Sequence, residues 1–234
     1  GGEHLAWGDT GTVIYANSVA GARSNFEGGP AALAAALSGR VAEYGYHLDR
    51  NRGGTVLVEL VDEPKDSCDW GAVGCLVGRE FPGYWEVPVI EGTQASPTPD
   101  ELKQLGAALA SYGSHGMFHL VGVTPEARTR DDAFHGNEPR ATMRIDRAAL
   151  DSVYSSFVPD KPEPDIVVFG TPQLSLFELK ELASLFDGRE VRCPVYATTS
   201  ASVLRSAQEF GYAETLRAAG VRLLSGARYR RNIH

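Results

Sequence analysis

The N-terminal segment carries residue types that can transfer protons and bind a carboxylate. Glu3 and His4 place a carboxylate beside an imidazole, and these side chains often move protons in enzymes. The stretch 16–29 interleaves hydrogen-bonding side chains with small residues, which let a ligand approach the backbone. Asn and Ser among glycines also make ordinary turns, which is the structural alternative. The substrate-binding residues predicted here are Asn17, Ser18, Asn25 and Arg23, whose planar fork suits a carboxylate.

Two further segments hold candidate proton-handling groups. His47 follows a Tyr-Gly-Tyr sequence, and His119 lies in an apolar stretch that runs into Thr124-Pro125-Glu126. We predict that His47 and Glu126 share the catalytic role with Glu3 and His4, and that His119 contacts the substrate. A histidine within an apolar strand is also commonly a core residue whose hydrogen bonds are satisfied internally.

Three stretches follow or end expected strands of a parallel sheet, the edge at which ligands usually bind. They are residues 170–173, 198–200 and 225–227, and each is rich in glycine or hydroxylated side chains. Helix N-termini present unpaired N–H groups to anions, so Thr171, Thr199 and Ser200 are predicted to contact a carboxylate or phosphate of the substrate. The alternative is that these residues only cap helices.

The first half of the chain is irregular in pattern. Apolar and β-branched runs indicate strands at 55–61, 85–90 and 117–123, and helices at 31–37 and about 101–111. Residues 13–16 fit either a buried strand or the start of a helix. The polar stretch 127–144 is predicted to be a surface loop.

The second half alternates strands with helices. Strands are expected at 165–170, 191–197 and 221–224, and helices at 146–157, 174–186, 201–210 and 213–219. This order is typical of a parallel sheet covered on both faces. The predicted class is therefore α/β, three-layered, with a mainly parallel sheet flanked by helices. We predict a substrate-site region at 1–144 and a parallel-sheet region at 145–234, which could form one domain of a longer chain.

Composition excludes several functions. The 22 basic and 30 acidic residues give a net charge of −8, which argues against sequence-independent nucleic-acid binding. No stretch approaches the ~20 apolar residues of a membrane span. The cysteines, Cys68, Cys75 and Cys193, have neither disulfide nor zinc spacing, so we expect reduced thiols, a cytoplasmic location and no bound metal.

Several of these segments resemble the catalytic domain of aconitase X. The first is Gly-Glu-His-Leu-Ala-Trp at 2–7, and it is specific. The others are 16–25, 27–29, 44–47, 105–111, 119–126, 175–176 and 198–200. The resemblance spans nearly the whole chain with its order intact. It implies dehydration of a small hydroxy acid such as cis-3-hydroxy-L-proline or phosphorylated mevalonate. It also implies an iron–sulfur cluster held by cysteines, and a small swivelling domain or subunit that completes the site.

The chain departs from that family pattern at the cluster ligands. Thr171 stands where a Gly-Cys-Pro-His stretch would have its cysteine, and residues 226–228 also lack one. A third expected cysteine would lie upstream of Gly1. Iron–sulfur iron is held by thiolates, so we expect no cofactor and predict that the cluster is lost.

Three hypotheses follow. The first is a cluster-free lyase that dehydrates or isomerises a small hydroxylated carboxylic acid, and the retained Glu3, His4 and Arg23 favour it. The second is a non-catalytic binding or scaffold subunit, which the missing cysteines favour. The third is an ordinary cluster dehydratase whose ligands come from a missing segment or from an unusual set.

Overall fold

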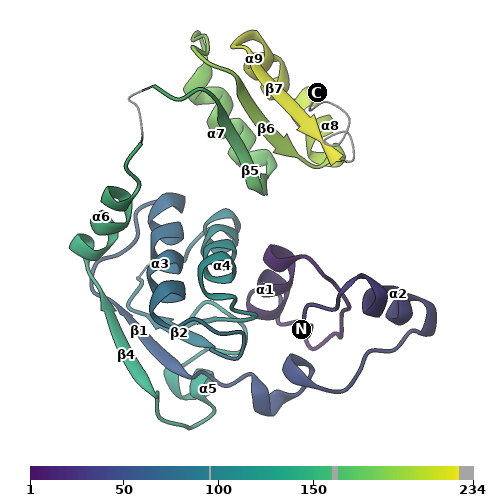
Figure 1. The fold of residues 1–234 in the computed structure, drawn as a ribbon, viewed down its shortest axis with the longest axis vertical. Helices are drawn as coiled ribbons and strands as arrows, with labels where there is room; N and C mark the ends of the chain where they lie inside the picture. Colours follow the sequence, from purple (N-terminus) through teal and green to yellow (C-terminus); the bar gives the residue numbers. More distant parts are fainter. Residues whose placement is uncertain (95, 160–162, 227–234) are drawn as a thin grey trace. The chain divides into compact units, whose positions relative to one another are not determined.

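The chain forms two compact units, Gly1–Phe157 and Val158–His234. A computed structural model describes residues 1–94, 96–159 and 163–226 (Figure 1). The division lies later than the predicted one between 144 and 145, because two elements after residue 140 belong to the first unit. Strand β4 (Ala141–Ile145) pairs with β1 (Val56–Leu60), and helix α6 (Arg147–Ser156) contacts α3 (Ser67–Glu80).

Short helical elements precede the first strand. They are α1 (Thr10–Ser18), α2 (Gly29–Ser38) and the 3₁₀ turns η1 (Gly45–His47) and η2 (Asp49–Asn51). Residues 13–16, which fitted a strand or a helix, lie in α1. Asp9 caps this helix by accepting a hydrogen bond from the Thr12 N–H at 2.8 Å, and Val13 and Ile14 are fully buried.

The first unit contains a four-stranded parallel sheet in the order β3-β2-β1-β4. Its further strands are β2 (Pro88–Glu91) and β3 (His119–Leu120). Side chains alternate between the faces of β1. Val56 and Val58 join the core with α3 and α4 (Pro99–Gly113), whereas Leu57 packs with Phe134 of α5 (Arg130–Phe134) on the other face. The predicted parallel α/β fold is confirmed (Figure 1).

Three local predictions were wrong. The expected loop 127–144 contains α5 and most of β4, and the expected strand 117–123 shrinks to two residues. Helix α3 was not predicted at all, because its glycines lower helix propensity. Gly74 is needed for packing: a Cβ there would lie 2.6 Å from the Ala108 Cβ and 2.8 Å from the Leu105 carbonyl oxygen of α4.

The second unit contains a three-stranded parallel sheet in the order β5-β6-β7. Its elements are β5 (Val167–Leu174), α7 (Leu176–Phe186), β6 (Val195–Thr199), α8 (Ala201–Glu209), α9 (Tyr212–Ala218) and β7 (Val221–Ser225). The predicted order of strands and helices is confirmed. Residues 170–173, expected at a strand end, instead lie inside β5 where its register shifts. Within the residues described, each helix is too short or too polar to cross a bilayer.

A buried ion pair joins α3 to α6. Asp69 accepts hydrogen bonds from Arg147 Nη1 at 2.7 Å and Nη2 at 3.0 Å, and from the Tyr154 hydroxyl at 2.6 Å. Its side chain is only 5% exposed. Burial alone would raise the pKa of the Asp69 carboxyl, but the hydrogen bonds from Arg147 and Tyr154 lower it to about 2.

Replacing Asp69 with asparagine is expected to cost about 2 kcal/mol of unfolding free energy at neutral pH, because charge-assisted hydrogen bonds are lost. A carboxyl whose pKa is lowered by folding stabilises above its unfolded pKa, and this stabilisation is lost as pH falls through the folded value. Urea unfolding should therefore show the difference shrinking from pH 3.8 toward pH 2. Asp151→Asn is the control, since that carboxylate also pairs with Arg147 but is 63% exposed. Equal losses in both variants would contradict the assignment.

Candidate functional site

Backbone pairing places the N-terminal segment beside the loop that follows α1. The Gly2 N–H donates to the Gly21 carbonyl at 2.6 Å, the Arg23 N–H to Glu3 at 2.9 Å, and the Leu5 N–H to Arg23 at 2.8 Å. These bonds form a short parallel bridge between His4 and Arg23. The His4 backbone is therefore fixed next to the polar segment although the residue itself is exposed.

A chain of three side chains runs from the interior to the surface. Glu27 Oε1 lies 2.8 Å from His47 Nε2, and His47 Nδ1 lies 2.8 Å from His4 Nδ1. The two imidazole rings are stacked, with their planes 18° apart. Two of the predicted catalytic residues, His4 and His47, are thus brought together. The predicted Glu3 is exposed beside them.

Among these three side chains, Glu27 is the one to which the sequence analysis assigned no role. Burial alone would raise the pKa of its carboxyl, but hydrogen bonds from His47, Ser24 and the backbone N–H groups of Glu27 and Asn25 lower it. The Ser24 hydroxyl donates at 2.8 Å. The sequence did offer a signal for Glu27. It is an acidic residue that lies two positions after Asn25 and directly before two glycines, inside a polar segment.

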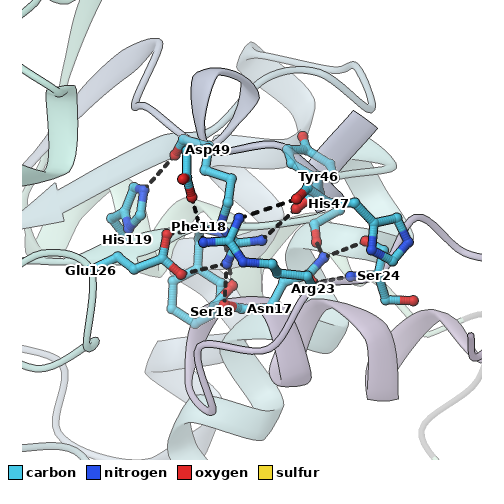
Figure 2. A network of polar contacts seen from close by, with 12 residues as sticks. Asn17, Ser18, Arg23, Ser24, Tyr46, His47, Asp49, Phe118, His119 and Glu126 are labelled. Carbon is cyan, nitrogen blue, oxygen red and sulfur yellow. Dashed lines mark hydrogen bonds and ion pairs between the residues drawn. The ribbon is translucent and has the colours of Figure 1, made fainter. Parts of the chain in front are cut away.

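Arg23 is bonded to the turns that carry His47 and Asp49 (Figure 2). Its Nη1 donates to the His47 carbonyl at 3.3 Å, and its Nη2 pairs with Asp49. The hydrogen bond from Arg23 lowers the pKa of the Asp49 carboxyl. The Asp49 side chain is 83% exposed, so it is a solvated partner that an incoming carboxylate can replace.

Beneath the cluster lies a fully buried arginine that the sequence analysis also missed. Arg52 donates Nε and Nη2 to the two carboxylate oxygens of Glu126, at 2.8 and 2.6 Å. It also donates to the backbone carbonyls of Tyr46 and Asn17, each at 3.0 Å. Glu126, predicted to move protons, is therefore one arm of a bidentate ion pair, an arrangement that suits positioning better than proton transfer.

His119 is fully buried behind Arg52. Its Nε2 lies 2.7 Å from the Arg52 carbonyl oxygen, which can only accept, so Nε2 carries the hydrogen. Its Nδ1 has no hydrogen-bond partner among the described residues. Burial lowers the pKa of the imidazole, which favours its neutral form.

Most predicted substrate-binding amides and hydroxyls bind the backbone instead. Asn17 donates to the Ser24 and Gly116 carbonyls at 2.9 and 2.8 Å, and Ser18 accepts from the Phe118 N–H at 2.9 Å (Figure 2). Asn25 donates its amide N–H to the Tyr44 carbonyl at 2.9 Å and accepts from the Tyr46 N–H at 2.6 Å. Its side chain also lines an open hollow of about 510 Å³ together with Phe26, Tyr44 and Tyr84. These residues therefore shape the site by fixing its loops.

The remaining predicted contacts lie in the second unit. Thr199 donates its hydroxyl to the Leu174 carbonyl at 2.6 Å, and Ser200 caps α8 by accepting from the Val203 N–H at 3.2 Å. Thr171 is exposed on β5. The structural alternative of helix capping thus applies to Ser200. Ala227, in the third predicted stretch, lies outside the described residues.

Neither unit brings together three cysteines that could hold an iron–sulfur cluster among the described residues. Cys68 is exposed and Cys75 is buried in the core, both on α3, and Cys193 lies in the second unit. Thr171 offers a hydroxyl, which is a poor ligand for soft iron. Among the described residues, no group of three His, Cys, Asp or Glu side chains is arranged to hold a metal ion.

Three family models match the chain in succession. They are the aconitase X first domain at residues 1–50, the second domain at 54–155 and the third domain at 164–227. The crystal structure of Thermococcus kodakaraensis aconitase X in its holo-form superposes with a TM-score of 0.86. It is 34% identical, over 95% of this chain and 56% of that one.

Named relatives agree with these matches. The phosphomevalonate dehydratase large subunit of Methanosarcina mazei is 40% identical over 95% of this chain and 53% of its own length. The cis-3-hydroxy-L-proline dehydratase of Pseudomonas aeruginosa is 37% identical over 96% of this chain and 39% of its own. The chain thus spans about half the length of these relatives, or less. On the strength of its domains, its relatives and its fold, the chain belongs to the aconitase X family.

Proposed function

We propose that this chain carries the acid–base site of a hydro-lyase that removes water from a small hydroxylated carboxylic acid. The observation that carries the proposal is the contact between the exposed His4 and the buried His47, with Arg23 bonded to the His47 carbonyl. The names of the relatives, all dehydratases of hydroxylated acids, support the same class of reaction.

Removing water β to a carboxylate requires a base for the carbon-bound proton and an acid for the departing hydroxyl. His4 is the exposed end of the histidine pair and is assigned the base. Arg23 is assigned the substrate carboxylate, with Asp49 as the partner that the substrate displaces. Glu3, exposed and adjacent to His4, is the candidate acid for the hydroxyl.

The reaction is proposed to proceed without an iron–sulfur cluster. The support is the donor set described above, in which Thr171 takes the place of a thiolate. The relatives named as large subunits support a further proposal, that a small swivelling domain or subunit completes the site. Cluster loss also favours the second candidate, a binding subunit without turnover, and the assay below separates the two.

The proposed activity is tested by incubating the chain in deuterated water with cis-3-hydroxy-L-proline or with phosphomevalonate. We expect NMR to show deuterium entering beside the carboxylate, and mass spectrometry to show a product lighter by one water. Exchange reports the base even when the hydroxyl leaves slowly. Absence of exchange and of water loss with both probes contradicts turnover by this chain alone, and favours a binding subunit or a site that the small domain or subunit must complete.

Replacing Arg23 with glutamine is expected to raise KM about tenfold or more, because a charge-assisted hydrogen bond to the substrate carboxylate is lost. The measurement is steady-state kinetics on whichever probe turns over. Arg50→Gln is the matched control and should leave KM unchanged, because Arg50 is an exposed arginine that follows Asp49 on the η2 turn. An unchanged KM in the Arg23 variant would remove this residue from the site.

A further inference from the structure

The hydrogen bonds of Glu27 determine where the protons of the histidine pair reside. An ionised carboxylate can only accept hydrogen bonds. Glu27 accepts them from the Ser24 hydroxyl and the Asn25 N–H, and its Oε1 lies 2.8 Å from the His47 ring nitrogen Nε2. The His47 nitrogen that faces it, Nε2, must therefore carry a hydrogen. In the neutral imidazole, Nδ1 of His47 is then the unprotonated nitrogen.

The second histidine follows from the first. His4 Nδ1 lies 2.8 Å from His47 Nδ1, and a hydrogen bond between two nitrogens needs one hydrogen between them. Because neutral His47 offers only a lone pair there, His4 must donate from Nδ1. The remaining nitrogen of neutral His4, Nε2, then bears the free lone pair and is the base of the pair.

The two ends of this row of hydrogen-bonded side chains differ in their exposure to solvent. The side chains of His47 and Glu27 are 1% and 7% exposed, whereas His4 is exposed. A proton from a ligand can therefore enter at His4 Nε2. The Nδ1 hydrogen of His4 can then pass to His47 Nδ1, which leaves His4 neutral and places the positive charge on His47 beside Glu27. No proton is created or lost, and the charge ends next to its counter-ion.

We propose that Glu27 is a positioning residue that fixes the tautomers of His47 and His4, so that the base is Nε2 of His4. The role of that base in catalysis rests on the proposed function, but the tautomer assignment does not. The carboxylate itself is assigned no contact with the substrate, because its side chain is buried and bonded to the buried His47.

The assignment is tested by long-range ¹H–¹⁵N NMR of the histidine rings in the full chain. We expect hydrogen on Nε2 of His47 and on Nδ1 of His4 in the unchanged protein, and a mixture of tautomers in Glu27→Gln, whose amide can donate as well as accept. Glu3→Gln is the control and should keep the original tautomers. Hydrogen on Nδ1 of neutral His47 overturns the proposal, and the unchanged protein alone decides this even if Glu27→Gln does not fold.

Kinetics separate this proposal from the proposed function. Glu27→Gln should lower kcat about 10- to 100-fold, as loss of a residue that orients a catalytic group does, while KM stays nearly constant. Glu27→Asp should recover part of the loss. The expected tautomers with no turnover would contradict the proposed function and leave the assignment intact. Turnover with unchanged kcat in Glu27→Gln would contradict the positioning role alone.

Discussion

Replacing Arg52 with methionine is expected to lower the unfolding free energy of the first unit by about 4 kcal/mol, the range found when one partner of a buried ion pair is removed. The guanidinium is fully buried and makes four hydrogen bonds, to Glu126 and to the carbonyls of Tyr46 and Asn17. Methionine fills part of the volume but donates none of these bonds.

Denaturation followed by tryptophan fluorescence measures this loss, because Trp7, Trp70 and Trp85 all lie in the first unit. Arg130→Met is the matched control. Its side chain is 46% exposed and its ion pair with Glu91 spans 3.4 Å, so a change below about 1 kcal/mol is expected. A similarly small loss for Arg52→Met would show that the buried pair contributes nothing to folding.

Replacing His4 with glutamine is expected to reduce turnover about 10²- to 10⁴-fold, the contribution of a positioned general base. Glutamine keeps a hydrogen-bond donor for His47 but cannot take up a proton. Because His4 is exposed, the stability of the protein should change little. The measurement is the rate of deuterium exchange beside the carboxylate of whichever probe reacts.

His135→Asn is the control for this change. His135 is an exposed histidine with a φ of 53°, a conformation that asparagine accepts, and it lies outside the cluster. Exchange at the original rate in His4→Gln would remove His4 from the reaction. A comparable drop in both variants would show that the assay reports a general effect.

The elements predicted well were those whose signals are local. Helix α7 is capped by Ser175, which forms reciprocal hydrogen bonds with Glu178 in the first turn. The strands on either side of α7 are short apolar runs. Strand β4 was missed because its outward residues, Thr142 and Arg144, make it look like a polar loop, while Ile145 alone is fully buried. An edge strand with one solvated face has little apolar signal.

Of the residues in the candidate site, His4, Arg23 and His47 were predicted from the sequence, Glu27 and Arg52 were not, and their contacts were not predicted. His4 and Arg23 lie in segments whose composition indicates function, and the structure joins both to His47. The pairing of Glu126 with Arg52 spans 74 positions, and only the folded topology selects that partner. A charged residue that is fully buried cannot be distinguished in one sequence from an exposed one of the same type.

A guanidinium tolerates less displacement than apolar packing does. Leucines can slide past one another by a fraction of an ångström and remain in contact, but a planar fork with four acceptors loses bonds when any one of them moves. Arg52 thereby fixes the position of the turn that carries His47 relative to the end of α1, because it bonds a carbonyl of each. The proposed proton relay, whose two links are each 2.8 Å long, depends on that fixed position.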